Sequence, residues 1–271
     1  MAETGAAQCA PGARMWLRAT WLGTLLLTWA APLGGQQPLA VPAPAPLSRD
    51  SVLGSPRTIR WYHAAAVIAG TSLLFIADGP VERFAQSHRS PSTDGAASVF
   101  RRFGQPEVYG TVSLGLVAAG LASGDDHLTR AGARAAFSVG LTGGATFLLK
   151  GVLGRERPEA GEGALDFDPF FPRTQGLPSG HAAAAFALAT SLADDIHRPW
   201  ATVGLYALAT GAGLSRINDD RHWLSDVALG AVVGVASAKL VSGRWRIFGL
   251  RTPSFLATPT GGAGLGWQAS F

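Results

Sequence analysis

The residues best suited to chemistry lie within 215–226, a polar stretch between two apolar segments. If a helix starts near His222, Asp226 lies about one turn further on, over the same helical face. A carboxylate there accepts one ring N–H of the imidazole and orients it, which leaves the other ring nitrogen for nucleophilic or acid–base work. Arg216 is predicted to end the preceding helix, and its guanidinium suits phosphate oxygens. The stretch therefore predicts an oriented histidine beside a site for an anion.

A second cluster is the run Pro178-Ser179-Gly180-His181. Pro178 stops any upstream helix, Ser179 is a favourable N-cap, and His181 opens an alanine-rich segment predicted to be helical. The free amides at a helix start that contains a glycine form an anion site. Taken alone, however, His181 is more simply explained as a polar residue at the start of a bundle helix.

A third cluster contains Lys150, Arg157 and Pro158, and it follows an apolar run. Lysine is scarce in this chain, since Lys239 is the only other one. Taken alone, the two cations of this cluster are explained by their favourable interaction with the carboxyl end of a helix.

Apolar periodicity predicts an all-α fold with a six-helix bundle core, plus a short amphipathic helix at 80–88 and a loop at 90–95. The six main helices are expected at 61–77, 107–122, 127–149, 181–194, 200–214 and 222–241. In an up-and-down bundle, successive helix ends alternate between two faces. The third helix therefore ends on the face where the fourth starts, the fifth ends and the sixth starts. All three clusters are predicted to converge on that face.

The combined set predicts phosphoryl chemistry. Three cations and the amides of a helix start match a phosphoryl group, whose charge is spread over its oxygens. His222 is the better nucleophile, because Asp226 stabilises positive charge on its ring, and His181 is then placed to protonate the leaving oxygen. This chemistry needs no metal, and the six histidines and one cysteine show no zinc-ligand spacing.

The three clusters, in this order, resemble the motifs of the type 2 phosphatidic acid phosphatase (PAP2) superfamily. They are Lys150-x6-Arg157-Pro158, Pro178-Ser179-Gly180-His181 and Ser215-Arg216-x5-His222-x3-Asp226, and the resemblance covers roughly 107–241. It implies a helical-bundle core, metal-independent hydrolysis of phosphomonoesters or diphosphates, and a phosphohistidine intermediate. It also implies that His181 is the acid, His222 the nucleophile and Asp226 its partner, and that phosphate is bound by Lys150, Arg157, Ser179, Gly180 and Arg216.

We therefore predict a phosphatase without a cofactor that acts on a phosphorylated lipid, isoprenoid or small molecule, or a non-specific periplasmic acid phosphatase. An alternative is a vanadate-dependent haloperoxidase, because the superfamily includes such enzymes and vanadate mimics phosphate; the chain is short for one. A non-catalytic transporter or scaffold would leave the motifs unexplained. The basic residues form no run with interleaved aromatics, which argues against a nucleic-acid partner. The sequence sets no oligomeric state.

Composition divides the chain into four segments. A basic start followed by a short apolar stretch predicts a signal peptide at 1–35, and five prolines predict a linker at 36–58. The PAP2-type phosphatase domain is expected at 59–242 and a tail or hairpin at 243–271, where alternating apolar residues indicate a strand. An uncleaved N-terminal anchor is the alternative to the signal peptide.

Two loops border the predicted site. The aromatic side chains in 159–177 either form a lid that shapes substrate choice or anchor the loop on the bundle. The corner residues Asp219, Asp220 and Arg221 are predicted to form a solvated turn rather than to touch substrate.

These features predict a protein of the bacterial cell envelope, periplasmic or membrane-associated. If a signal were removed and all six helices spanned the membrane, the active face would lie in the cytoplasm, whereas membrane enzymes of the family that the chain resembles usually face outward. Either the helices do not span or the N-terminal prediction is wrong. We favour the first interpretation, because several predicted helices are shorter than the roughly 20 apolar residues of a span.

Overall fold

The computed structural model describes residues 56–161, 163–170, 175–247, 254–257 and 263–266. The predicted signal peptide lies outside these ranges, and so does the predicted linker except for 56–58. All described residues belong to the compact unit that begins at Ser48.

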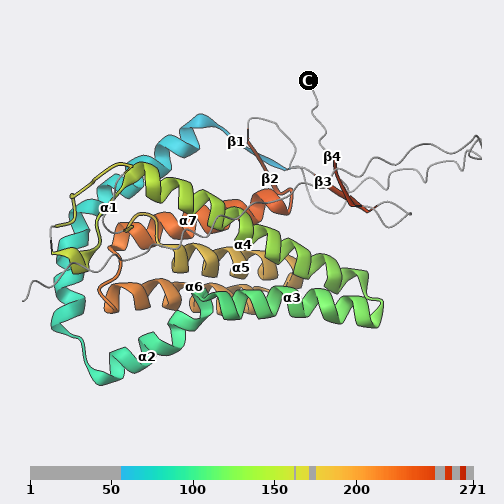
Figure 1. Cartoon of the computed structure of the whole chain (residues 1–271), viewed down its shortest axis with the longest axis horizontal. Coiled ribbons are helices and arrows are strands. Elements are labelled where there is room, and N and C mark those ends of the chain that lie inside the picture. Colours follow the sequence, from blue (N-terminus) through green and yellow to red (C-terminus); the bar gives the residue numbers. More distant parts are fainter. Residues whose placement is uncertain (1–55, 162, 171–174, 248–253, 258–262, 267–271) are drawn as a thin grey trace, which may run out of the picture. The chain divides into compact units, whose positions relative to one another are not determined.

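Helices form most of the described chain, which confirms the predicted all-α class (Figure 1). They are α1 (Trp61–Ser87), α2 (Pro91–Arg101), α3 (Pro106–Ser123), α4 (Asp126–Leu153), α5 (Gly180–Ile196), α6 (Pro199–Asn218) and α7 (Leu224–Val241). Short 3₁₀ helices cover Arg102–Gly104 and Pro158–Ala160. Helix α5 packs against α4, α6 and α7 and is the centre of the bundle, while α3 packs on α4, α2 on α6 and α1 on α7.

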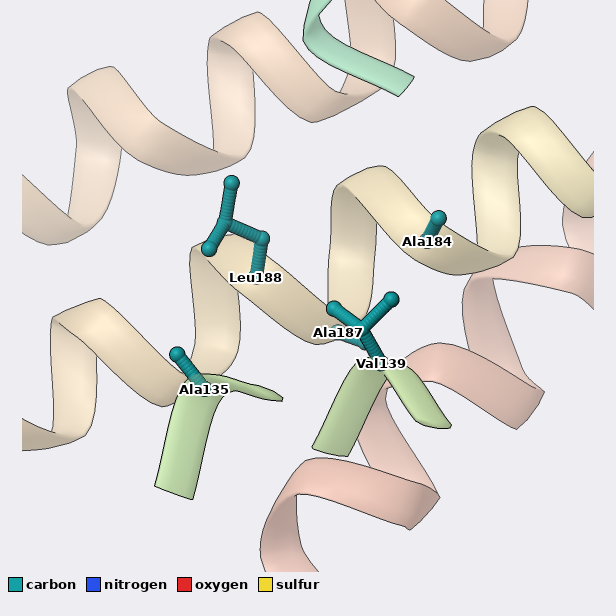
Figure 2. Close-up of a cluster of buried hydrophobic side chains, with 5 residues drawn as sticks. All are labelled: Ala135, Val139, Ala184, Ala187 and Leu188. Atoms are coloured by element: carbon teal, nitrogen blue, oxygen red, sulfur yellow. The ribbon is translucent and has the colours of Figure 1, made fainter. Parts of the chain in front are cut away.

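The core of the bundle consists of small side chains, which let the helices approach closely. Figure 2 shows Ala135 and Val139 of α4 against Ala184, Ala187 and Leu188 of α5, and these five side chains are buried. Alanine also has the highest helix propensity, so the same residues favour both the helix and its tight packing.

Two glycines of α7 fix its position against the start of α5. A Cβ on Gly230 would lie 2.5 Å from the backbone oxygen of Ser179, and a Cβ on Gly234 would collide with the backbone oxygen of Ala183. The backbone N–H of Ser179 also donates to the carbonyl of Asp226 at 2.9 Å. These contacts bring the second and third sequence motifs together.

The structure corrects the predicted helices near the amino end of the domain. The predictions at 61–77 and 80–88 are one helix, α1, which continues through Pro80. The predicted loop at 90–95 instead starts α2, because Ser90 caps the helix by accepting from the Thr93 N–H and Pro91 occupies its first turn, where no N–H is needed. The short additional helix is therefore α2, and not 80–88 as predicted.

The start of α7 is also different from the prediction. The helix begins at Leu224, not at His222, with Trp223 as N-cap. The Asp226 carboxylate accepts the Trp223 N–H at 3.0 Å, so it serves as the capping-box acid of this helix. His222 consequently precedes the helix rather than lying on its face.

Four short strands occur among the described residues. β1 (Arg57–Ile59) pairs in parallel with β2 (Trp245–Ile247), so the last residues of the predicted linker contact the predicted tail. β3 (Ser254–Ala257) and β4 (Ala263–Gly266) form an antiparallel hairpin within that tail. Leu265 of the predicted alternating strand lies in β4, and the rest of that pattern lies outside the described residues.

Three helices, α1, α4 and α7, are long and apolar enough to cross a membrane. Two of them, α1 and α4, are longer than predicted. The interpretation that the helices are too short to span a membrane therefore does not apply to these two. On α1, large apolar side chains face outward, with Trp61 72% and Ile76 77% exposed. Exposed apolar surface of this kind is typical of contact with a membrane or another protein.

Candidate active site

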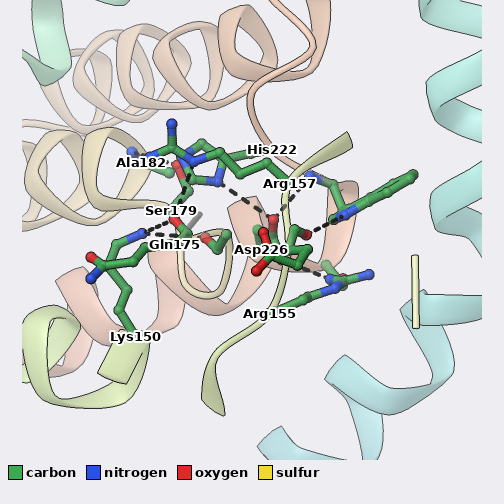
Figure 3. Close-up of polar contacts among 12 residues, drawn as sticks. Lys150, Arg155, Arg157, Gln175, Ser179, Ala182, His222 and Asp226 are labelled. Atoms are coloured by element: carbon green, nitrogen blue, oxygen red, sulfur yellow. Dashed lines mark hydrogen bonds and ion pairs between the residues drawn. The ribbon is translucent and has the colours of Figure 1, made fainter. Parts of the chain in front are cut away.

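His222 and Asp226 form the buried centre of the candidate site (Figure 3). The Nδ1 atom of His222 lies 3.4 Å from Oδ2 of Asp226. This is an ion-pair distance, and Nδ1 makes no hydrogen bond of standard geometry within the described residues. Catalytic hydrogen bonds are often long in free enzymes and shorten when substrate binds. The predicted pairing is therefore present, although it arises from a turn before α7 and not from one helical face.

His181 is placed by the amino end of α5, as predicted. Ser179 is the N-cap, and its hydroxyl accepts from the Ala182 N–H at 3.5 Å. Gly180 is the first residue of the helix, and a Cβ on it would contact nothing within 4 Å. The amides of the first turn of a helix carry partial positive charge and attract anions.

Arg157, His181, Arg216 and His222 line one pocket of about 530 Å³. The structure thus brings together predicted residues from all three motifs. The pocket is completed by side chains outside the predicted site: Arg89, Arg101, Asp219 and Arg221. The lining contains five arginines and one carboxylate, which makes it an anion site.

The corner residues Asp219, Asp220 and Arg221 form the predicted turn after α6, with Arg221 exposed, and Asp219 and Arg221 also line the pocket. Asp219 accepts from Arg101 at 2.7 Å and from Arg216 at 2.8 Å, so it fixes two arginines of the pocket wall. Arg221 lines the pocket and forms an ion pair with Glu159 at 2.6 Å. The sequence favoured a turn without substrate contact because polar residues in a short interhelical turn are usually solvated.

Ser179 and Gly180 are predicted phosphate ligands that do not line this pocket, and Lys150 is a third. Its Nζ atom donates to the carbonyl of Gln175 at 2.6 Å and lies 3.4 Å from that of Gly176. It ties the end of α4 to the segment before α5 (Figure 3). The charge of Lys150 thus lies close to His222, but the Lys150 side chain is not part of the pocket wall.

Burial is the main cause that lowers the pKa of His222, to about 4. The Asp226 carboxylate raises this pKa, while the charges of Lys150 and Arg157 lower it further. Burial, followed by the neighbouring Arg216 and His222, lowers the pKa of His181 to about 4. Both rings are therefore neutral near pH 7. A neutral His222 is ready to act as a nucleophile, and an anion in the pocket would raise the pKa of His181 by offsetting the nearby cations.

Arg155, which lies behind Asp226, was not among the site residues predicted from the sequence. Its Nη1 donates to Oδ1 of Asp226 at 2.7 Å, and its Nη2 donates to Oδ2 of Asp78 at 2.6 Å. The charged ends of all three side chains are fully buried. The signal available in the sequence was an arginine inside the first motif, but nothing there pointed to Asp78 in α1.

The aromatic loop at 159–177 is anchored on the bundle at one described position. The ring of Phe167 lies 6.0 Å from that of Phe75 in α1, and Arg155 lies 5.6 Å from its centre. Phe170 is 70% exposed. The anchoring interpretation therefore holds for Phe167, while Phe171 lies outside the described residues.

Residues 131–247 match the family model of the PAP2 superfamily. This region, less than half of the chain, resembles a PAP2 domain. It contains all three motifs, so the resemblance that the motifs indicated is confirmed, with a later start than the predicted 107.

A curated relative of the PAP2 domain is the lipid A 1-phosphatase of Porphyromonas gingivalis, 39% identical over 112 residues. The match covers 41% of this chain and spans only 22% of the relative.

Two solved structures are also similar. One is the transmembrane PAP2 type phosphatidylglycerolphosphate phosphatase of Bacillus subtilis, with a TM-score of 0.52 and 20% identity, covering 66% of this chain and 94% of that one. It supports the PAP2 fold. The other is LpxE of Aquifex aeolicus, with a TM-score of 0.49 and 23% identity, covering 61% and 94%. The long apolar helices α1, α4 and α7 indicate a membrane-associated protein.

Among the described residues, no group of three or more histidine, cysteine, aspartate and glutamate side chains could hold a metal ion. The predicted independence from metals stays a prediction until activity is measured.

Proposed function

We propose that the chain is a metal-independent lipid phosphatase that hydrolyses a phosphomonoester or diphosphate through a phosphohistidine at His222. The observation that carries the proposal is the pocket in which His222, paired with Asp226, meets His181 and two motif arginines. A cationic pocket with two histidines suits the transfer of a phosphoryl group to and from a nitrogen nucleophile.

In the first step, the ring nitrogen of His222 that faces away from Asp226 attacks phosphorus. A P–N bond forms while the bond from phosphorus to the leaving oxygen breaks, and His181 gives its proton to that oxygen. Asp226 stabilises the positive charge that develops on the His222 ring. The arginines and the first amides of α5 stabilise the charge on the phosphoryl oxygens.

In the second step, water attacks phosphorus and gives a proton to His181. The P–N bond breaks, its electron pair returns to His222, and inorganic phosphate leaves. Both histidines are then in the protonation states that start the next cycle, so the reaction needs no other reactant.

A lipid substrate is supported by the setting of the site. Helices α1, α4 and α7 carry enough apolar length to meet a bilayer, and a similar protein is named a lipid A 1-phosphatase. An isoprenoid diphosphate or another lipid phosphate would present the same phosphoryl group from the membrane surface.

The test is phosphate release by the full chain in detergent with EDTA, from p-nitrophenyl phosphate, phosphatidic acid, lipid A and undecaprenyl diphosphate. We expect turnover of lipid substrates that His222→Ala abolishes, while His63→Ala, a change at an exposed histidine of α1, leaves it unchanged. A ³²P label that is bound to the protein, is released by acid and is retained in base would identify phosphohistidine.

A strict requirement for a divalent metal, or full activity in His222→Ala, would overturn the mechanism. Halide oxidation that appears only with vanadate and peroxide would instead support a haloperoxidase.

We also propose that the site faces the periplasm of a bacterial cell envelope and that an N-terminal signal directs the chain there. In support, the chain starts with a basic and then apolar stretch that suits export. A single cysteine at the pocket rim, Arg221→Cys in a Cys9→Ser background, should react in intact spheroplasts with a membrane-impermeant maleimide. Labelling only after lysis would place the site in the cytoplasm.

A further inference from the structure

A buried ion network connects α1 to the catalytic pair. Asp78 of α1 accepts from Arg155 through Oδ2 and from the Ser225 N–H through Oδ1 at 2.8 Å. The Ser225 hydroxyl accepts from Arg155 Nη1 and donates to Asp78 Oδ2, both at 2.6 Å. Arg155 completes the chain with its bond to Asp226 Oδ1 at 2.7 Å. The order of contacts is Asp78, Arg155, Asp226 and then His222.

The guanidinium of Arg155 also contacts two aromatic rings and a backbone carbonyl. Its Cζ atom lies 4.6 Å from the ring centre of Phe75 and 5.5 Å from that of Trp223. Its Nε and Nη2 atoms donate to the carbonyl of Ala164. A guanidinium bound to this many partners has one accessible orientation, and it transmits that orientation to the carboxylates that it contacts.

The two oxygens of Asp226 have separate tasks. Oδ1 accepts from Arg155, while Oδ2 accepts the Trp223 N–H and faces Nδ1 of His222 at 3.4 Å. A small rotation of the carboxylate decides whether Oδ2 comes within hydrogen-bond distance of the ring. The contact between Arg155 and Oδ1 resists that rotation, so it controls the orientation of His222.

The network also sets the charge behind His222. Arg155 alone would cancel the negative charge of Asp226, and the imidazolium that forms in the reaction would lose its stabilising partner. Asp78 offsets the charge of Arg155, so the three buried groups together keep one net negative charge next to the ring. Neither Asp78 nor Arg155 lines the pocket, and both side chains are fully buried.

We propose that Asp78 and Arg155 are positioning residues for His222, which hold the Asp226 carboxylate in place and maintain its negative charge. The inference rests on the proposed role of His222 as nucleophile. It adds to that role a residue from α1, outside the PAP2 match at 131–247.

The decisive variant is Asp78→Asn in the full chain, since it removes the charge but keeps the shape and the acceptor for Ser225. We expect kcat to fall by about 10- to 100-fold, the range typical of residues that orient a functional group, while KM changes less than about twofold. The acidic limb of the kcat–pH profile should move to lower pH, because less negative charge favours the neutral ring.

The groups that face His222 must be the same in the wild type and in Asp78→Asn for this comparison. They are Asp226 from α7, His181 from α5, Arg216 from α6, Lys150 from α4 and Arg157 from the following loop. None is altered by Asp78→Asn. The pKa of His222, followed by NMR of ¹⁵N-histidine protein in detergent, should therefore fall in this variant.

Asp194→Asn is the matched control. Asp194 is also a largely buried carboxylate in a helix, 2.6 Å from Lys239, but it lies at the far end of α5. We expect it to lower the melting temperature and leave kcat, KM and the pH profile unchanged.

Two further variants keep the inference testable if Asp78→Asn does not fold. Arg155→Lys keeps the charge but cannot bridge both carboxylates, so kcat should still fall about tenfold. Ser225→Ala removes one link between Asp78 and Arg155 and should lower kcat by a few-fold in the same direction.

A folded Asp78→Asn protein with wild-type kcat, pH profile and His222 pKa would overturn the inference, as would an effect equal to that of Asp194→Asn. Absence of phosphatase activity in the wild type would instead overturn the proposed function. In that event the NMR measurement of the His222 pKa still tests whether Asp78 acts on this ring.

Discussion

The two ends of α5 both carry clusters of charge, but only the cluster at the amino end lies beside the pocket described above. At the amino end, five arginines and one carboxylate line an open pocket beside two histidines. At the carboxyl end, two adjacent carboxylates meet nearby cations: Asp194 pairs with Lys239 and Arg244, and Asp195 pairs with Arg134. The arginines of the first cluster line a pocket that a ligand can enter, whereas the charges of the second pair with one another between helices.

The comparison shows which electrostatic feature identifies a site in this bundle. Ion pairs occur at both ends and fasten helices to one another. Among the described residues, only the amino end combines a pocket lined by arginines with histidines whose pKa values are lowered to about 4. Perturbed groups next to a cavity are a stronger indication of function than ion pairs alone.

The largest expected difference between the ends comes from the nucleophile. His222→Ala should lower kcat by roughly 10⁴- to 10⁶-fold, because no other group can form the covalent intermediate. His197→Ala at the far end, where the ring contacts Arg244 at 3.0 Å, should leave kcat within about twofold of the wild type. Both are measured as lipid phosphate hydrolysis at saturating substrate.

An arginine at each end should also respond differently. Arg216→Gln removes charge from the pocket wall and should lower kcat by about 10²- to 10³-fold, the cost of losing one donor to a developing charge. Arg244→Gln, at the far end, should not alter kcat. Equal losses in the two variants would show that these arginines act through stability and not through the reacting group.

Stability should depend on pH through the amino end. The pKa of His222 is lowered from 6.5 to about 4 in the folded chain, so the unfolded chain binds the proton more readily. The contribution of His222 to the free energy of unfolding is then fully present above about pH 6.5. It is lost as pH drops toward 4, by at most on the order of 3 kcal/mol. Melting curves from pH 7 to 4 should show this slope, and His222→Gln should reduce it.

The smallest effect is expected at the far end. Asp194→Asn should cost about 1 kcal/mol of stability, since the pair with Lys239 is partly exposed and solvent screens it. Chemical denaturation of the variant at pH 7 and pH 5 should give the same difference, because this site contributes through structure and not through a lowered histidine pKa.

Much of the site was predictable from local patterns. Ser179 and Gly180 identify the start of α5, and helix parity places His181, Arg157 and Arg216 on one face; the structure puts these last three in one pocket. Such predictions succeed because capping and helix periodicity depend on neighbours in sequence.

Other features depend on contacts between distant residues, which no local pattern encodes. Asp78 lies far from Arg155 and Asp226 in sequence, and its burial against them follows from the packing of α1 on α7. Asp219 became part of the pocket because α2, which the sequence did not predict, brings Arg101 to it.

The sequence by itself determined the helical class, the three motifs and the chemistry that they support, because residue type and helix period are local properties. The tertiary structure decided that His222 precedes α7 and that Asp226 caps it. It also decided that Lys150 stays out of the pocket wall and that Asp78 and Arg155 stand behind the catalytic pair. Those outcomes depend on the close approach of α5 and α7 and on how buried charges find partners across the bundle.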